Sequence, residues 1–306
     1  MTRTPTETTL TPSNLAGWNE PGTHLAVIGF PVRHSLSPPM HNAALARMAE
    51  TDVRFASWRY WKIEASPEEL PATLGVLHHL GFTGINLTMP HKQIAVGLVT
   101  AIDPPAAAMG AVNTLRHTPT GYEGFNSDGY GIIEALRESI GVEVSGANIV
   151  LLGAGGAARA AAVAFVERGC RSLAIGYRSP GPLDALLEIL RPVSGAAIVR
   201  GFRLDSPPND LPADAVIVNA TPLGLKPGDP PAVDLAKFPG KPSVYDMNYT
   251  PPETPLTVAA TALGLRAASG LSMLVYQGVR SLEIWTGAKV PVDVMSAAAS
   301  AALARR

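Results

Sequence analysis

Residues 148–162 read Asn148-Ile-Val-Leu-Leu-Gly-Ala-Gly-Gly-Ala-Ala-Arg-Ala-Ala-Ala162, an apolar run that breaks into glycines and continues as an alanine-rich segment. This order predicts a strand, a tight turn and a helix start. It fits the dinucleotide-binding pattern G-x-G-x-x-A. Gly153 permits the turn, Gly155 lets the backbone approach a pyrophosphate, and Ala158 lets helix and strand pack closely. The N–H groups of the helix start would then face the anion. Such turns also occur without a ligand, so the stretch alone leaves both interpretations open.

Further apolar runs follow the glycine turn at the spacing typical of alternating strands and helices. Together with residues 149–152 they predict about six strands, the number in a doubly wound dinucleotide-binding domain. These runs cover residues 172–177, 197–202, 215–219, 243–247 and 265–268.

The end of the second of these strands bears on the choice of cofactor. NAD-binding domains tend to place Asp or Glu there for the ribose 2′-hydroxyl. This chain instead reads Gly176-Tyr-Arg-Ser-Pro180. The guanidinium of Arg178 suits a 2′-phosphate through paired, charge-assisted hydrogen bonds, which favours NADP. The alternative is a surface arginine in a turn.

Composition and charge restrict the class of protein. The 306 residues are enough for two domains, and 24 Lys+Arg against 25 Asp+Glu give a net charge of −1. This balance argues against nucleic acid or an anionic membrane as a partner. The lone Cys170 excludes an intramolecular disulfide and fits a cytoplasmic location. No apolar run is long enough to span a membrane. The neighbouring His78 and His79 have no further His or Cys at metal-binding spacing, so the sequence does not indicate a metal site.

Two serines follow the first predicted strand, residues 24–29. Ser37 precedes Pro38 and fits the N-cap of a helix with proline in its first turn. Ser35 has no such capping role in this pattern. Two hydroxyls at the carboxyl end of a strand suit a polyhydroxylated ligand, with a plain helix cap as the alternative.

A lysine and an aspartate stand out as candidates for proton transfer. Residues 83–92 form a strand that ends in polar groups, with Lys92 just beyond it. Lys92 is either a solvated surface lysine or an ammonium that gives a proton to a substrate oxygen in a cleft. Asp128 opens a predicted helix, where it is either an N-cap or a carboxylate that orients a lysine and a substrate hydroxyl.

Motifs in a fixed order resemble the shikimate dehydrogenase family over about residues 24–290. The first half carries Ser35-Leu-Ser37, Asn86-Leu-Thr-Met-Pro-His-Lys92, Ala111-Val-Asn-Thr114 and Asn126-Ser-Asp128. The second half carries Gly153-Ala-Gly-Gly-Ala-Ala-Arg159, Asn219-Ala-Thr-Pro-Leu-Gly224, Tyr245-Asp-Met-Asn-Tyr249 and Met273-Leu-Val-Tyr-Gln277.

The resemblance implies an α/β fold with two domains. A Rossmann-like, doubly wound NADP-binding domain, residues 128–270, is inserted into a smaller α/β substrate-binding domain made of residues 23–127 and 271–306. The first 22 residues, rich in Thr and Pro, are predicted to be a flexible tail. The active site is expected in the cleft between the domains.

The resemblance further implies reversible, NADPH-dependent reduction of 3-dehydroshikimate to shikimate, in the biosynthesis of chorismate and the aromatic amino acids. Lys92 and Asp128 are the expected catalytic pair. The side chains expected to hold the substrate are Ser35, Ser37, Thr88, Asn113, Tyr249 and Gln277. The expected cofactor contacts are Gly153, Ala154, Gly155, Gly156, Ala157, Arg178, Thr221, Met247 and Gly270. No metal is expected, and the protein is predicted to be a monomer or a homodimer.

One departure from the family keeps an alternative open. The cofactor loop, Tyr177-Arg-Ser-Pro-Gly-Pro182, keeps the first of two usual arginines as Arg178 but has Pro182 in place of the second. A quinate/shikimate dehydrogenase that uses NAD or NADP is therefore the nearest alternative. An enzyme resembling methylenetetrahydrofolate dehydrogenase would leave the Ser-x-Ser and Asn-Ser-Asp segments unexplained. A non-catalytic shikimate or dinucleotide sensor is disfavoured because Lys92 and Asp128 are both present.

Overall fold

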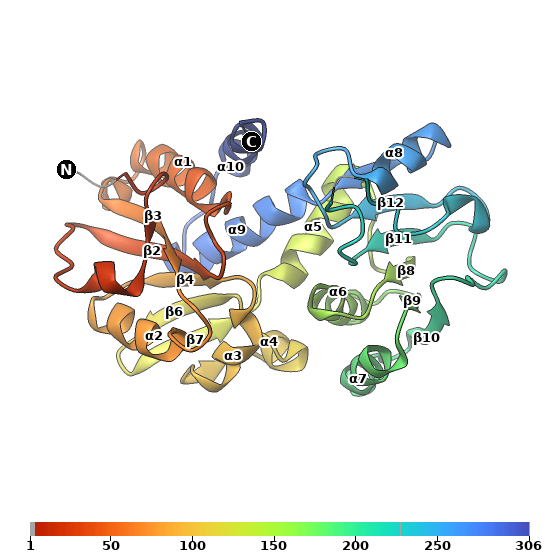
Figure 1. Cartoon of the computed structure of the whole chain (residues 1–306), viewed down its shortest axis with the longest axis horizontal. Helices are drawn as coiled ribbons and strands as arrows, with labels where there is room; N and C mark the ends of the chain where they lie inside the picture. Colours follow the sequence, from red (N-terminus) through yellow and green to blue (C-terminus); the bar gives the residue numbers. More distant parts are fainter. Residues whose placement is uncertain (1–3, 227, 306) are drawn as a thin grey trace. The chain divides into compact units, whose positions relative to one another are not determined.

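The glycine-rich stretch forms a strand, a turn and a helix in the computed structural model, which describes residues 4–226 and 228–305. Strand β8 (Asn148–Leu152) is buried along its whole length, and helix α6 (Gly156–Glu167) follows the turn. The chain divides into two units (Figure 1). The first unit contains the residues up to Ser127 and those from Gln277, and the second unit contains Asp128–Tyr276.

The predicted domain boundary after residue 127 coincides with this division, whereas the second boundary falls after residue 276 and not after 270. The difference arises because α9 (Leu271–Thr286) is one continuous helix whose partners change along its length. Its first turn belongs to the second unit, where the Ser272 hydroxyl lies 2.8 Å from that of Ser139 and 3.0 Å from that of Tyr245.

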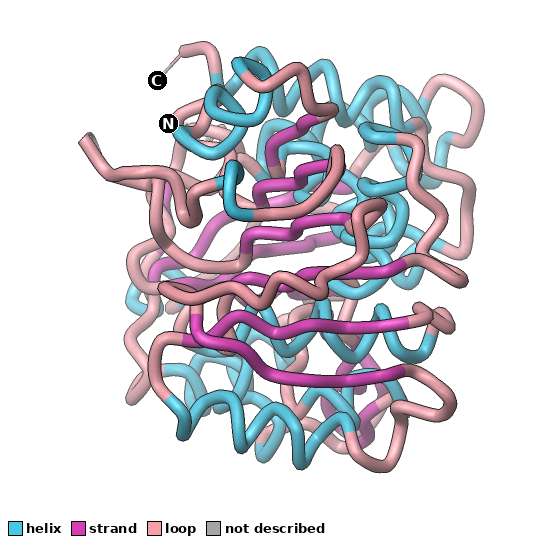
Figure 2. Tube along the Cα trace, turned by 90° about the vertical axis from the view of Figure 1, so that its right-hand side faces the viewer, coloured by secondary structure: helices cyan, strands magenta, loops and turns pink. Residues whose placement is uncertain are grey.

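The second unit is built on one parallel sheet. Its elements besides β8 and α6 are α5 (Asp128–Ile140), β9 (Ser172–Tyr177), α7 (Pro180–Leu190), β10 (Ile198–Arg203), β11 (Val216–Asn219), η4 (Leu235–Lys237), β12 (Ser243–Asp246), α8 (Pro255–Ala262) and β13 (Ala267–Ser269). The strand order is β10-β9-β8-β11-β12-β13, with every neighbouring pair parallel. This is the doubly wound order in which the first strand lies between the second and the fourth, so the predicted fold class is confirmed. Helices lie on both sides of the strands (Figure 2).

An apolar core holds one face of this sheet in place. Side chains of the central strands pack there with Leu256 and Ala260 of α8 and with Leu235 of η4, all nearly inaccessible to solvent. Because the strands are short and parallel, their carboxyl ends are brought to a single edge, where ligands of such folds bind.

The first unit contains a seven-stranded mixed sheet. Its elements are β1 (Thr9–Leu10), η1 (Pro12–Leu15), β2 (Thr23–Gly29), α1 (Ser37–Ala49), η2 (Val53–Phe55), β3 (Trp58–Glu64), α2 (Leu70–His79), β4 (Gly84–Leu87), α3 (His91–Ile94), η3 (Ala95–Gly97), β5 (Ala101–Ile102), α4 (Pro104–Met109), β6 (Thr114–Thr118), β7 (Gly121–Phe125) and α10 (Val292–Leu303). The strand order is β1-β3-β2-β4-β6-β7-β5. Strands β1, β3, β2 and β4 are parallel, and the hairpin β6–β7 joins β4 in antiparallel orientation.

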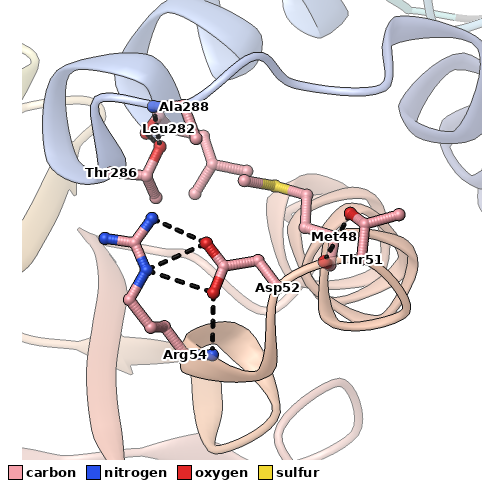
Figure 3. A network of polar contacts seen from close by, with 7 residues as sticks. All are labelled: Met48, Thr51, Asp52, Arg54, Leu282, Thr286 and Ala288. Carbon is pink, nitrogen blue, oxygen red and sulfur yellow. Dashed lines mark hydrogen bonds and ion pairs between the residues drawn. The ribbon is translucent and has the colours of Figure 1, made fainter.

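The C-terminal part of α9 is anchored in the first unit. At its end, the Thr286 hydroxyl donates to the Leu282 carbonyl at 2.7 Å and accepts from the Ala288 N–H at 3.2 Å. The side chains of Leu282 and Met48, the latter from α1, extend toward one another (Figure 3). Further up the helix, Gly278 leaves room for α1, because a Cβ there would lie 2.6 Å from the Met40 side chain. These contacts fix the segment of α9 that starts at Gln277.

The N-terminal segment is packed where the sequence predicts a flexible tail over residues 1–22, so that prediction is wrong for the part from Thr9 onward. Strand β1 pairs with β3, and Leu10 and Leu15 are 1% and 3% exposed. The Trp18 ring meets Trp61 edge to face at 5.3 Å between centroids. Although the segment is rich in Thr and Pro, it contains three large apolar side chains, Leu10, Leu15 and Trp18. Their burial offsets the loss of conformational entropy when the segment becomes ordered.

Replacement of Leu10 by alanine is therefore expected to lower the free energy of unfolding by about 2–5 kcal/mol, because it leaves a cavity in the core of the first unit. Urea denaturation measures the change. Glu7→Ala is the matched control, since Glu7 is an exposed side chain in the same segment. Equal stability of the two variants would mean that the segment does not pack in solution.

Candidate active site

The glycine turn of the second unit has two kinds of glycine. Gly153 adopts φ +104°, and its Cβ would lie 3.1 Å from the Thr221 methyl group, so the fold itself requires glycine there. Gly155 and Gly156 are exposed at the start of α6, and a Cβ at either position would meet no atom within 4 Å. Nothing in the described part of the protein crowds these two positions, which suits the close approach of a pyrophosphate to a helix N-terminus.

Three more predicted cofactor contacts meet at the carboxyl ends of β11, β12 and β13. The Met247 N–H donates to the Asn219 carbonyl at 2.9 Å. The Thr221 N–H and hydroxyl both donate to the Asn219 side-chain oxygen, at 2.9 and 2.7 Å. A Cβ on Gly270 would lie 2.1 Å from the Met247 carbonyl oxygen, so glycine allows β13 to end beside this residue. Thr221, Met247 and Gly270 are thus brought to one edge of the sheet, next to Gly153.

A buried carboxylate supports this edge. Asp246 is 0% exposed and accepts hydrogen bonds from the Asn219 amide at 2.9 Å, the Asn248 N–H at 3.0 Å and the Thr254 hydroxyl at 2.7 Å. Burial raises the pKa of Asp246, and these three donors oppose that shift. The motif around Tyr245 contains Asp246, but its anchoring role depends on partners from other loops and was not predicted from the sequence.

Arg178 is exposed directly after β9, and α7 begins at Pro180. Pro182 therefore lies in the first turn of α7, where a proline is well tolerated. The remaining predicted contacts in this unit are accessible to differing degrees: Ala154 and Tyr249 are half-buried and Ala157 is exposed.

In the first unit the local capping contact is made by Ser35 and not by Ser37 as the sequence pattern predicts. Helix α1 begins at Ser37, so the N-cap position falls on Leu36, which provides no side-chain cap. Instead the Ser35 hydroxyl accepts from the Ser37 N–H at 3.2 Å, so Ser35 has the local capping role that the pattern assigned to Ser37. Ser37 is 7% exposed, and its side chain hydrogen-bonds Tyr60. The proline at position 38 fits the first turn in either case, so the local pattern does not distinguish the two serines.

The loop that carries the Ser-x-Ser pair rests on two aromatic side chains. His41 stacks on Tyr60 with 4.0 Å between ring centroids, and its Nδ1 donates to the Ser37 carbonyl at 2.9 Å. Burial lowers the pKa of His41 to about 4, so the imidazole is neutral at physiological pH. It therefore serves as a rigid support for the loop and not as a charged group.

Lys92 lies on the short helix α3, just beyond the strand end that the sequence predicts. Its carbonyl accepts from the Val112 N–H at 2.9 Å. The preceding His91 is fully buried, and its Nε2 donates to the Ala65 carbonyl at 2.9 Å. Thr88, at the end of β4, donates its N–H to the Ile28 carbonyl of β2 at 2.9 Å. The backbone around the lysine is thus tied to three separate segments, and the lysine side chain is half-buried.

Asn113 is 1% exposed and is held by the residue that precedes Asp128. The Ser127 N–H donates to the Asn113 side-chain oxygen at 2.8 Å. Asp128 is the first residue of α5, where a carboxylate interacts favourably with the helix N-terminus. Asn113 is therefore fixed against Ser127, the last residue of this part of the first unit.

A further polar residue, Asn86, connects these side chains and was not among the predicted site residues. It is 5% exposed on β4, its side-chain oxygen accepts from the Tyr60 hydroxyl at 2.7 Å, and its amide donates to the Asn113 carbonyl at 3.1 Å. A chain of contacts thus runs from Ser37 through Tyr60 and Asn86 to Asn113. An asparagine inside an otherwise apolar strand was the available signal, since a buried amide needs partners.

Within residues 4–226 and 228–305, no three His, Cys, Asp or Glu side chains are grouped so that they could hold a metal ion. In the same part of the chain, no helix has both the length and the apolar character that a membrane crossing requires.

The strand order, the glycine turn and the residues that meet at the carboxyl ends of the strands define the second unit as the nucleotide-binding domain of a dinucleotide-dependent oxidoreductase. Comparison with family models matches residues 27–115 to the shikimate dehydrogenase substrate binding domain and residues 270–299 to the shikimate 5′-dehydrogenase C-terminal domain. With the close relatives described next, this shows that the chain belongs to the shikimate dehydrogenase family.

A curated relative, the shikimate dehydrogenase (NADP(+)) of Geobacter metallireducens, is 38% identical over 92% of this chain and 97% of its own length. The crystal structure of shikimate 5-dehydrogenase from Thermus thermophilus in complex with NADP(H) and shikimate is 34% identical, with a TM-score of 0.79 over 92% of this chain and 99% of that one. The quinate dehydrogenase of Corynebacterium glutamicum in complex with NAD is 28% identical, with a TM-score of 0.81 over 92% of this chain and 99% of that one.

Proposed function

We propose that this protein is an NADP-dependent shikimate dehydrogenase that reversibly reduces 3-dehydroshikimate to shikimate, a step toward chorismate and the aromatic amino acids. The observation that carries this proposal is that a chain of this family contains both a candidate substrate site, in the first unit, and a candidate dinucleotide site, in the second unit. In the first unit Asn113 follows Val112, whose N–H donates to the Lys92 carbonyl, and the Thr88 carbonyl accepts from the N–H of His91 in the same segment. In the second unit Gly155 and Gly156 are uncrowded at the carboxyl ends of the strands of a doubly wound sheet.

The residues present fit a dinucleotide. Gly155 and Gly156 would face the pyrophosphate, Arg178 would face the 2′-phosphate, and Thr221, Met247 and Gly270 would flank the nicotinamide end. When bound, the cofactor supplies or accepts the hydride. The contribution of the protein is to orient the two reactants and to handle the proton.

Lys92 and Asp128 are the proposed proton-handling pair. Lys92 donates to the oxygen that becomes the alcohol or stabilises it as a charge, and Asp128 orients the ammonium and a substrate hydroxyl. Hydroxyl and amide side chains hold the carboxylate and hydroxyls of the substrate, because a buried polar group without a partner is costly and so enforces selectivity. These are Ser35, Ser37, Thr88, Asn113, Tyr249 and Gln277.

A broader quinate/shikimate dehydrogenase that also accepts NAD is the second candidate. It is favoured by Pro182, which removes a second guanidinium from the cofactor loop, and by the similarity to a quinate dehydrogenase that binds NAD. A cytoplasmic location and a monomeric or homodimeric state stay predictions, the former supported by the single, buried Cys170.

The deciding experiment is a spectrophotometric assay of NADPH and NADH formation with shikimate and quinate in all four combinations. Turnover of shikimate with NADP that far exceeds the others is the expected result. Comparable turnover of quinate, or with NAD, would assign the chain to the broader group. A folded protein that binds NADPH but turns over neither substrate would identify a sensor.

Replacement of Arg178 by alanine is expected to raise the KM for NADP by about tenfold or more, because a charge-assisted hydrogen bond to the 2′-phosphate is lost. The KM for NAD should stay nearly constant, since NAD has no 2′-phosphate. Steady-state kinetics with both cofactors measure the two values. Arg168→Ala, at the opposite end of α6 from the glycine turn, is the control. Equal losses with both cofactors would contradict the assignment of Arg178.

A further inference from the structure

Three hydroxyl groups meet in the interior of the first unit, and the proposed function gives them no role. Thr114, Ser127 and Ser281 are each 0% exposed. The oxygen of Ser281 lies 2.8 Å from that of Thr114 and 3.1 Å from that of Ser127, and the latter two are 3.2 Å apart. Ser281 reaches the other two from α9, far along the chain. Buried hydroxyls are costly unless they are fully hydrogen-bonded, so this cluster calls for an explanation.

The cluster determines which end of the Asn113 side-chain amide faces it. One atom of that amide receives the Ser127 N–H at 2.8 Å and the Thr114 hydroxyl at 2.9 Å, and it lies 3.1 Å from the Ser127 hydroxyl oxygen. A backbone N–H can only donate, so the atom facing it must be the amide oxygen. With the oxygen bound to the cluster, the NH₂ end of Asn113 points the other way, and only donors are presented on that side.

Ser281 joins this arrangement to the helix that carries Gln277. Its hydroxyl donates to the Gln277 carbonyl at 2.9 Å and accepts from the Asn86 amide at 2.9 Å. It therefore links α9 to β4. The Ser127 hydroxyl has a single proton; given to the Ser281 oxygen at 3.1 Å, it also links Ser281 to the residue whose N–H holds the Asn113 oxygen. The neighbouring inward positions of α9, Val279 and Leu282, are apolar. A hydroxyl at position 281 is thus the polar exception on a buried helix face.

We propose that Ser281 is a positioning residue for substrate binding: its hydroxyl holds Ser127, whose N–H keeps the Asn113 amide with its NH₂ group directed away from the cluster, and it holds the start of this part of α9, with Gln277, in place. The inference rests on the proposed function, in which Asn113 and Gln277 contact the substrate. It adds that the ligand atom at Asn113 is an acceptor. A substrate hydroxyl there binds through its lone pair, which leaves its own proton for a carboxylate.

The orientation is tested with Asn113→Asp and Asn113→Ala. The aspartate keeps an oxygen for the Ser127 N–H but presents a second oxygen where the NH₂ group was. The KM for shikimate should therefore rise at least as much in the aspartate variant as in the alanine variant. An aspartate variant that keeps the wild-type KM would show that the ligand donates at this position, and the proposed orientation would be wrong.

The role of Ser281 is tested by a double-mutant cycle with Ser281→Ala and Asn113→Ala. Ser281→Ala is expected to raise the KM for shikimate roughly fivefold to tenfold, with a smaller change in kcat and an unchanged KM for NADP. In the Asn113→Ala background the same substitution should change that KM by only about twofold, because the effect through Asn113 is gone and only the effect through Gln277 remains. Ser139→Ala is the control, since it removes a hydroxyl–hydroxyl contact to Ser272 in the second unit.

The outcomes separate this inference from the function itself. Full additivity of the two substitutions, or an unchanged KM in Ser281→Ala, would overturn the positioning role while the wild type still turned over shikimate. A wild type that does not bind shikimate would overturn both. If Ser281→Ala does not fold, Ser281→Cys fills the site with a slightly larger side chain that is a weaker donor and acceptor, and the same pattern in KM is expected at smaller amplitude.

Discussion

Replacement of Lys92 by alanine is expected to lower kcat for shikimate oxidation by about two to four orders of magnitude, while the KM for shikimate changes only a few-fold. A positioned acid or base acts mainly in the transition state, so its loss reduces kcat more than ground-state binding. The backbone of this segment does not depend on the ammonium group. It is held by the bonds from Val112 to the Lys92 carbonyl and from His91 to Ala65.

Steady-state kinetics together with thermal unfolding separate catalysis from stability for this variant. Gln93→Ala is the matched control, because Gln93 is an exposed neighbour on the same short helix. The control should keep wild-type kcat, and both variants should unfold near the wild-type temperature. A Lys92→Ala enzyme with nearly full kcat would remove this lysine from the chemistry and leave Asp128 as the remaining candidate.

The nucleotide-binding unit could be predicted from the sequence because its determinants are local. The central strands are short, buried apolar runs, and the glycine turn lies between a strand and a helix that are adjacent in the chain. Parallel βαβ connections have one preferred handedness, so six such strands restrict the topology to very few arrangements. The order found, with β8 between β9 and β11, is one of these.

The polar interior of the first unit could not be predicted in the same way. Asn86 and Ser281 are in contact although they are 195 positions apart in the chain, and neither lies in a pattern that names its partner. The motifs around Asn113 and Gln277 indicate candidate ligand contacts, but not the hydroxyl cluster that connects them. Such contacts depend on how helix α9 returns to the sheet of the first unit, which periodicity does not reveal.

Composition misled at the N-terminus for a related reason. The abundance of Thr and Pro in residues 1–22 suggests disorder, yet Leu10, Leu15 and Trp18 are sufficient to dock the segment on β3 and its neighbours. A few large apolar side chains outweigh an average over the segment, because burial of each contributes about 1.5–3 kcal/mol.

A second large effect, on the KM for NADP, is expected from a substitution in the glycine turn, where Gly153 and Gly155 are required for different reasons. Gly155→Ser is expected to raise the KM for NADP by on the order of tenfold to a hundredfold without loss of stability. Serine is a better N-cap than glycine, so α6 should be as stable as before. Among the residues that the structure describes, no atom lies within 4 Å of its Cβ, so we expect the new side chain to crowd a bound ligand and not the fold.

Gly153→Ala provides the opposite case. Its φ of +104° and the 3.1 Å approach of the Thr221 methyl group make a side chain costly in the fold itself, by about 1 kcal/mol or more. Thermal unfolding and NADPH titration of both variants separate the two effects. Loss of stability in Gly153→Ala, together with loss of cofactor affinity at full stability in Gly155→Ser, would support the proposed contact between the turn and the pyrophosphate. Wild-type affinity in Gly155→Ser would mean that the dinucleotide does not approach this turn.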